Sequence, residues 1–243
     1  MIRRPLIVGG SNGIGLGIAT ALADRDEVEV VYIVDKDEVD PQYMHYKFRL
    51  FQYDLLDDYE FPWDRFDDID SLIITAGFGR LELFKDIDEE TIESYFKVNT
   101  IPTIKLVHQF YDLLSGSDDF YCCVLVSIAG FLSSPWLSVY GSTKAALRSF
   151  IESVNVELKK SGSPNRILNV SPGYIDGTSF YGGETDLTAI ASLSQEIIKR
   201  LERREDLYIP DFDEVYCNVL KRYQEDFRAE GDRSYEYKKN KIR

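Results

Sequence analysis

A tyrosine and a lysine four positions apart could move a proton to or from an alcohol or a ketone. Tyr140 and Lys144 lie in a stretch with helical periodicity, so their side chains fall one turn apart on the same helix face. An ammonium close to a phenol favours the phenolate form, and a phenol tuned in this way can act as a general acid or base near neutral pH. The spacing therefore predicts a catalytic Tyr-Lys pair.

This spacing alone is weak evidence, because the chain has sixteen tyrosines. It recurs at Tyr32/Lys36, Tyr43/Lys47, Tyr235/Lys239 and Tyr237/Lys241. Of the five tyrosines in these pairs, only Tyr140 has a serine thirteen residues upstream, and that serine, Ser127, closes a predicted buried strand. Ligands of doubly wound sheets bind at the carboxyl ends of the strands, so we expect Ser127, Tyr140 and Lys144 to converge on one substrate oxygen.

A glycine-rich turn between the first predicted strand and the first predicted helix could hold a dinucleotide. Val8–Gly15 contains glycines with the spacing Gly-x-x-x-Gly-x-Gly. Such a backbone can turn tightly and approach a pyrophosphate, and the helix N-terminus adds free N–H groups. A purely structural turn explains the glycines equally well when they are taken alone, but their place between strand and helix favours binding.

An acidic residue stands where an adenosine ribose would lie. Asp35 ends the second predicted strand, twenty residues after Gly15. A carboxylate there can accept hydrogen bonds from the ribose hydroxyls and would repel a 2′-phosphate. The alternative is an ordinary turn aspartate before Lys36. Together with the glycine turn, Asp35 predicts NAD as cofactor, with NADP less favoured.

These residues need elements to position them, and short β-branched runs alternate with amphipathic stretches along the chain. The runs predict strands at Pro5–Val8, Val28–Asp35, Phe48–Tyr53, Ser71–Thr75, Tyr121–Ser127, Arg166–Val170 and Leu207–Ile209. The amphipathic stretches predict helices at Ile14–Asp24, Glu89–Leu114, Val139–Lys160, Thr188–Arg204 and Asp213–Arg228.

The alternation predicts an α/β fold with a doubly wound parallel sheet of about seven strands and helices on both faces. Most strand runs are continuously apolar, as expected for strands covered on both sides. We see no linker or repeat, so we expect a single domain over 1–243. Within it, 174–205 would form a substrate loop and helix, with a glycine hinge after Phe180 and Tyr181, and 233–243 a flexible basic tail.

Charge and length exclude several classes of function. The net charge is −14, which disfavours a nucleic acid or an anionic membrane as partner. No apolar run approaches the ~20 residues of a membrane span. Met1–Val8 leaves no room for a signal peptide, so we expect a cytoplasmic protein.

The cysteines and histidines favour packing over metal binding. Cys122 and Cys123 are adjacent on a predicted strand and should point to opposite faces, which suits a reduced, buried role. His45 and His108 have no other ligand at metal spacing. The segment 54–70 carries eight carboxylates and one arginine, and we interpret it as a solvated face rather than a metal site. No metal is expected.

At this point the chain resembles the short-chain dehydrogenase/reductase family in its single-domain form. The resemblance covers roughly Pro5 to Thr178, and the remainder more loosely. Its motifs are the glycine turn, Asp54-Leu55 after the third strand, Ile74-Thr75-Ala76-Gly77 after the fourth, and Pro172-Gly173 after the sixth. Asn99, Ser127, Tyr140 and Lys144 fill the positions of the family's catalytic tetrad.

The resemblance implies a set of roles. Tyr140 would be the acid/base, Lys144 would stabilise its phenolate and hold the nicotinamide ribose, Ser127 would polarise the substrate oxygen, and Asn99 would hold a water linking Lys144 to solvent. The cofactor contacts implied are Gly9, Ser11, Asn12, Gly13, Ile14, Gly15, Asp35, Asp54, Leu55, Ala76, Gly77, Tyr140, Lys144, Pro172, Gly173, Ile175 and Thr178.

The sequence departs from the family pattern at several positions. Val8 replaces a threonine, and Ile74-Thr75 replace two asparagines whose family role is to brace the sheet. The threonine that normally follows the Pro-Gly turn is displaced by one position, with Gly177 in its slot and Thr178 next. This displacement weakens the expected contact with the nicotinamide carboxamide.

The expected function is hydride transfer between a nicotinamide dinucleotide and a secondary alcohol or ketone, by a homodimer or homotetramer paired through its long helices. Two alternatives share parts of the pattern. One is a dinucleotide-binding sensor without turnover, against which the complete tetrad argues. The other is a sugar-nucleotide-modifying enzyme of related fold, for which little chain remains to build a substrate domain. Aromatic residues expected in the pocket are Phe78, Phe131, Trp136, Tyr174, Phe180 and Tyr181.

Overall fold

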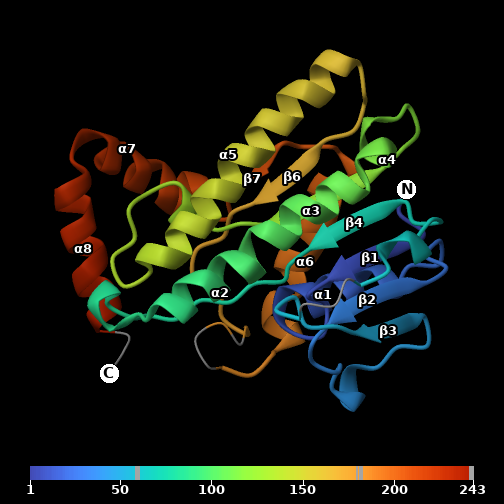
Figure 1. Ribbon diagram of the computed structural model, residues 1–243, viewed down its shortest axis with the longest axis horizontal. Helices are drawn as coiled ribbons and strands as arrows, with labels where there is room; N and C mark the ends of the chain where they lie inside the picture. Colours follow the sequence, from blue (N-terminus) through green and yellow to red (C-terminus); the bar gives the residue numbers. More distant parts are fainter. Residues whose placement is uncertain (58–60, 179, 181–182, 241–243) are drawn as a thin grey trace.

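A computed structural model describes residues 1–57, 61–178, 180 and 183–240 (Figure 1). Its described strands form one seven-stranded parallel sheet in the order β3-β2-β1-β4-β5-β6-β7. The strands are β1 (Pro5–Val8), β2 (Val31–Asp35), β3 (Phe48–Gln52), β4 (Ser71–Ile74), β5 (Tyr121–Leu125), β6 (Ile167–Val170) and β7 (Leu207–Tyr208). The predicted doubly wound sheet is confirmed; β1 has the predicted bounds, and the other strands are one to three residues shorter than predicted.

Two apolar layers cover the sheet. One layer packs α1 (Gly13–Ala23) and α6 (Leu187–Glu202) on one face. The other packs α3 (Ile101–Gln109), α4 (Tyr111–Ser115) and α5 (Ser138–Ser161) on the opposite face. Cys122 belongs to the second layer and Cys123 to the first, because successive strand side chains point to opposite faces. Both thiols are buried, and neither is in a disulfide.

The prediction of one long helix over Glu89–Leu114 is wrong. The structure divides it into α2 (Glu89–Asn99), α3 and α4, with Thr100 at φ −121°, ψ −59° between the first two. Pro102 explains the break, because its ring lacks an N–H and would clash with a carbonyl of the preceding turn in a continuous helix. The break places Asn99 at the end of α2.

Local sequence signals fix several other helix ends. Asp88 begins α2 by accepting a hydrogen bond from the Thr91 N–H at 2.7 Å, and Asp186 begins α6 by accepting from Thr188 and Ala189. Gly162 ends α5 in the left-handed region, at φ +85°. The C-terminus of α5 is therefore set by Gly162, a signal that can be identified in the sequence.

The C-terminal segment differs from the prediction. The expected helix Asp213–Arg228 is a π-helical turn over Phe212–Tyr216 followed by α7 (Cys217–Glu225), and α8 (Phe227–Lys239) continues after Asp226. Residues 233–239, expected in a flexible tail, are thus helical. Figure 1 shows α7 and α8 standing apart from the sheet, beyond the start of α5. Among the described residues, no helix has the length and apolar character needed to cross a bilayer.

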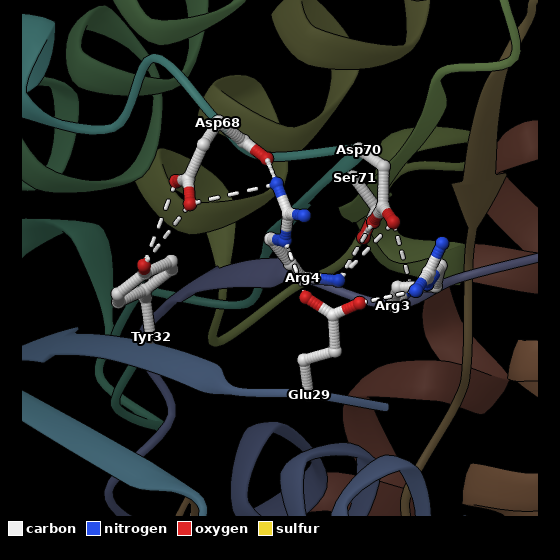
Figure 2. Close-up of polar contacts among 7 residues, drawn as sticks. All are labelled: Arg3, Arg4, Glu29, Tyr32, Asp68, Asp70 and Ser71. Atoms are coloured by element: carbon white, nitrogen blue, oxygen red, sulfur yellow. Dashed lines mark hydrogen bonds and ion pairs between the residues drawn. The ribbon is translucent and has the colours of Figure 1, made fainter. Parts of the chain in front are cut away.

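Asp68 and Asp70, in the acidic segment 54–70, take part in polar contacts at the amino end of the sheet (Figure 2). The Asp70 carboxylate accepts the backbone N–H of Arg3 at 2.7 Å and that of Arg4 at 3.1 Å. Arg4 also pairs with Glu29 at 2.8 Å and with Asp68 at 3.7 Å. Asp70 therefore links the residues before β1 to the start of β4. This network lies at the amino ends of the strands, away from their carboxyl ends.

Candidate active site

The structure brings three of the four tetrad residues to one place around α5. Ser127 follows β5, and its hydroxyl accepts a hydrogen bond from the Ala129 N–H at 3.1 Å while facing the Pro172 carbonyl at 3.4 Å. Tyr140 lies in the first turn of α5, and both residues line the same cavity. The Lys144 Nζ lies 5.6 Å from the centre of the Tyr140 ring. The fold therefore places Ser127 and Tyr140 in one cavity with Lys144 beside the tyrosine ring, and their convergence on one substrate oxygen stays a prediction.

Lys144 is a buried cation. Its side chain is 3% exposed, and its Nζ donates to the Leu125 carbonyl at 2.9 Å. Desolvation lowers the pKa of Lys144 to about 8. The Lys144 side chain is therefore mostly protonated at neutral pH, and its positive charge lies close to the Tyr140 ring.

Asn99 is held in the site by hydrogen bonds to the backbone of Phe78. Its amide is fully buried, accepts the Phe78 N–H at 2.9 Å and donates to the Phe78 carbonyl at 2.9 Å. Its Nδ2 also lies 3.3 Å from the Thr143 hydroxyl of α5. A Cβ added at Gly77 would sit 3.1 Å from Asn99 Oδ1 and 3.4 Å from Lys144 Nζ, so these two side chains flank the Gly77 backbone. Asn99 thus fixes the segment after β4 against α5.

The glycine turn has the geometry of a cradle that side chains would fill. Gly9 has φ +92°, and a Cβ there would lie 2.3 Å from the Ala76 nitrogen. A Cβ on Gly15 would lie 2.1 Å from the Gly9 carbonyl oxygen. Both contacts are impossible, so only glycine permits this close approach of β1, α1 and the segment after β4. The N-terminus of α1 opens onto the cavity beside Asn12, Gly13 and Ile14, as a pyrophosphate site requires.

Two threonines that lie against this turn complete its surroundings. The Thr178 side chain lies next to Gly13, since a Cβ added at Gly13 would be 3.8 Å from the Thr178 Cβ. The Gly13 N–H donates to the Thr185 hydroxyl at 2.9 Å. The Thr185 contact was not predicted, because nothing in the sequence near 185 marks it as a neighbour of residue 13. A bound phosphate would have to take this N–H from Thr185.

A second cavity, of about 1140 Å³, continues from the glycine turn past the ends of β2 and β3. It is lined by the predicted Asp35, Asp54, Leu55, Ala76 and Gly77. The Asp35 carboxylate accepts the Ser11 N–H at 2.9 Å and the Asp37 N–H at 3.2 Å. Lys36 also lines this cavity, where its Nζ lies 3.4 Å from the Asp37 carboxylate. Carboxylates therefore outnumber cations at the place expected for the adenosine ribose.

The cavity that contains Ser127 and Tyr140 has a volume of about 560 Å³. Its lining includes the predicted residues Pro172, Gly173, Ile175 and Thr178, and it also includes side chains from the C-terminal helices. The lining residues of the C-terminal segment are Val215, Tyr216, Val219, Arg222, Glu230, Arg233, Ser234, Tyr237 and Lys238. We call this set the roof.

The sequence predicted a helix over Asp213–Arg228 and a flexible tail over 233–243, but nothing in either stretch marks it as part of the cavity lining, so the roof was not predicted. The aromatic prediction for the pocket is met in part. Tyr174 and Phe180 line the cavity, and the Phe180 ring lies 5.1 Å from that of Tyr140. Phe78 stacks on Tyr95, however, Phe131 packs beside Arg148, and Trp136 packs against Tyr235. Tyr181 and the proposed hinge glycine Gly182 lie outside the described residues.

The described residues fit a nicotinamide dinucleotide. The glycine cradle and the helix N-terminus suit a pyrophosphate, the Asp35 cavity suits an adenosine, and the cavity beside Tyr140 suits a nicotinamide with its substrate. All three lie at the carboxyl edge of the sheet, where the strand order reverses between β1 and β4. This is the place where open α/β sheets bind their ligands.

Relatives of the chain share parts of its sequence. An uncharacterized oxidoreductase from Staphylococcus saprophyticus is 25% identical over 205 residues, which cover 79% of this chain and 86% of that protein. An uncharacterized oxidoreductase from Saccharomyces cerevisiae is 25% identical over 186 residues, which cover 73% of this chain and 56% of the yeast protein. The chain thus spans little more than half the length of the yeast relative.

Solved structures share the fold. A short chain dehydrogenase from Burkholderia cenocepacia in complex with NADP superposes with a TM-score of 0.74 at 19% identity, covering 96% of this chain and 97% of the other. An alcohol dehydrogenase from the archaeon Thermococcus sibiricus, complexed with 5-hydroxy-NADP, gives 0.69 at 21% identity, covering 86% and 96%. A family model described as short chain dehydrogenase matches residues 4–188, which include the glycine turn and helix α5. Since this match covers most of the sequence, the chain belongs to the short chain dehydrogenase family.

Proposed function

We propose that this protein transfers a hydride between NAD and a secondary alcohol or ketone, with Asn99, Ser127, Tyr140 and Lys144 as its tetrad. The observation that carries the proposal is the shared cavity. Ser127 and Tyr140 line it beside the glycine turn, and the buried Lys144 ammonium stands behind the tyrosine ring. A carbonyl oxygen in this cavity would meet both hydroxyls.

The nicotinamide, when bound, supplies the hydride chemistry. The residues of the chain would handle the proton and the charge. The Tyr140 hydroxyl gives its proton to the substrate oxygen in reduction and takes it back in oxidation. The Ser127 hydroxyl donates a hydrogen bond to the same oxygen, and the Lys144 charge stabilises the phenolate that forms. Asn99 holds the segment Gly77–Phe78, which separates α5 from the glycine turn.

The NAD preference rests on charge. Asp35, Asp37 and Asp54 line the adenosine cavity together with the cations Lys36 and Arg80, and Lys36 is paired with Asp37 at 3.4 Å. A 2′-phosphate placed there would face more carboxylates than cations. Solved relatives carry NADP, as in the Burkholderia cenocepacia and Thermococcus sibiricus structures, so NAD preference would be a property of this chain's own residues.

The substitution Tyr140→Phe tests the mechanism. It removes the proton donor and keeps the ring that packs on Phe180, so we expect kcat to fall by about a thousandfold on any ketone that the wild type reduces. The Kd of NADH should change by less than about twofold, because the glycine turn is untouched. Steady-state kinetics and fluorescence titration measure these two quantities.

Tyr46→Phe is the matched control, since Tyr46 is an exposed tyrosine that does not line this cavity. Its kcat should stay within about threefold of the wild type. A Tyr140→Phe enzyme that keeps a sizeable fraction of its activity would contradict the mechanism. NADH binding with no turnover of any alcohol or ketone would favour the sensor alternative instead.

A further inference from the structure

The roof of the substrate cavity is positively charged, although the whole chain is strongly acidic. The charged residues among the described lining of this cavity are Arg222 on α7 and Glu230, Arg233 and Lys238 on α8. Three cations therefore face one carboxylate, in a chain whose net charge is −14. A local excess of this sign needs an explanation, because the rest of the cavity is largely apolar.

The single carboxylate is fully engaged. Glu230 is buried, and its two oxygens accept Arg222 Nε at 2.7 Å and Arg222 Nη2 at 3.0 Å. Arg233 Nη1 lies 2.7 Å from the same carboxylate. The hydrogen bonds from Arg222 lower the pKa of Glu230, so this residue stays ionised and neutralises one guanidinium. Among the four charged residues of the roof, no second carboxylate balances the remaining guanidinium.

The two arginines play different parts. The two-bond pair between Arg222 and Glu230 joins α7 to α8 and so has a structural role. Arg233 lies on the same helix as Glu230, three residues further along, so its bond to Glu230 links no further element. Its side chain is 57% exposed, and the guanidinium has more N–H donors than this one bond uses.

Lys238 adds a further cation that the fold holds in place. Its Nζ donates to the Ser134 hydroxyl and to the Pro135 carbonyl, the latter at 3.0 Å. These partners come from the loop before α5, which carries Tyr140. These hydrogen bonds hold the Lys238 ammonium against the loop that precedes α5.

We propose that this roof binds the anionic end of the substrate, so that the enzyme acts on ketones or secondary alcohols that carry a carboxylate or a phosphate away from the reacting carbon. The apolar side chains between, among them Leu81, Leu137, Val215 and Val219, would cover the carbon chain. A guanidinium presents parallel N–H groups that match the oxygens of either anion. This inference rests on the proposed reductase function.

The test compares straight-chain methyl ketones of graded length that end in a carboxylate with their methyl esters and with the matching chains that end in a phosphate. We expect kcat/KM for the best acid to exceed that of its ester by about tenfold, since one charge-assisted contact is worth about that factor. The phosphate chains show which anion the site takes. The Kd of each compound for the enzyme–NADH complex is measured by calorimetry in parallel.

Two variants alter the charge in opposite directions. Arg233→Met removes a cation and should lower the acid-to-ester ratio by about fivefold. Glu230→Gln keeps the side-chain shape, leaves the guanidinium groups unbalanced and should raise the ratio. Arg228→Met is the matched control, because Arg228 is an exposed arginine of α8 outside the cavity, and its ratio should not change.

Equal kcat/KM for acids and esters, or a loss on Glu230→Gln that is the same for both, would overturn the inference and leave the reductase function standing. If no ketone is turned over, the proposed function fails instead. The calorimetric Kd values then still decide the inference, because anion binding by the roof does not require catalysis.

Discussion

At position 144 the fold buries a lysine whose charge the proposed reaction would use, and this burial has an energetic consequence. In the unfolded chain Lys144 keeps the ordinary pKa of 10.5, whereas burial lowers it to about 8 in the folded protein. Between these two values the unfolded state binds the proton and the folded state does not. Unfolding therefore takes up a proton in this range, and the contribution of Lys144 to stability rises with pH.

We therefore expect Lys144→Met to be more stable than the wild type near neutral pH, and this advantage to shrink between about pH 8 and about pH 10 by up to about 1.4 kcal/mol per pH unit. Urea unfolding at several pH values, without cofactor, measures the difference. Lys105→Met, at an exposed lysine of α3, is the control and should show no such pH dependence. If the free energy of unfolding of Lys144→Met exceeds that of the wild type by the same amount at every pH, burial of the Lys144 charge is not the cause.

Asp35 carries the prediction of cofactor preference. Wild-type protein should bind NADH more tightly than NADPH, and Asp35→Asn should narrow the ratio of the two Kd values by about tenfold. Asparagine keeps an acceptor for the Ser11 N–H and removes only the charge. Fluorescence titration with both dinucleotides measures the ratios, with Glu38→Gln on the same loop as control. Tighter NADPH binding by the wild type would reverse the assignment.

Among the elements, the Pro-Gly turn after β6 and the π-helical turn Phe212–Tyr216 meet at one contact. A Cβ on Gly173 would lie 1.6 Å from the Tyr216 hydroxyl oxygen. Tyr216 is largely buried there, and desolvation raises the pKa of its phenol. The Pro172-Gly173 turn, which lines the cavity, is therefore in direct contact with the roof.

Gly173→Ala should lower the free energy of unfolding by about 2 kcal/mol, because the new methyl group overlaps Tyr216. Tyr216→Leu removes the overlapping ring, so the double variant should lose less than the sum of the two single losses. Urea unfolding of the four proteins completes the cycle. Strict additivity would show that the two positions do not touch.

The sheet and the proximity of Tyr140 and Lys144 could be predicted from the sequence because their signals are local. A buried strand reads as a continuous apolar run, and Tyr140 and Lys144 share one helix turn. The break at Thr100 could also have been predicted, since Pro102 marks it. The roof could not be predicted, because its position depends on contacts such as that of Lys238 with Ser134, 104 residues apart in sequence.

On the scale of the whole molecule, several apolar side chains remain exposed on the helices of one face. They include Ile101 on α3, Leu113 on α4 and Val156 on α5, which is 59% exposed. Helix α5 spans 24 residues and, unlike the divided α2–α4 segment, keeps the length predicted for a pairing helix. We expect these faces to pair copies of the chain.

Light scattering at micromolar concentration should therefore give a mass well above the 28.0 kDa of one chain. Val156→Glu should shift the population toward that single-chain mass, because a charge on a pairing face would be buried without a partner. Met44→Glu, at an exposed apolar residue near the other side of the sheet, should leave the mass unchanged. Only 28.0 kDa particles from the wild type would exclude the pairing.

The family match ends at residue 188, whereas every roof residue lies at 215 or beyond. The proposed catalytic residues and the roof, which we propose selects the substrate, thus occupy successive stretches of the chain, in contact across the cavity and at Gly173. Evolution could exchange the second stretch while keeping the first, so that a common chemistry acquires new substrates. Recombination near Pro210, just after the last strand, would be the natural crossover point for engineering such chimaeras.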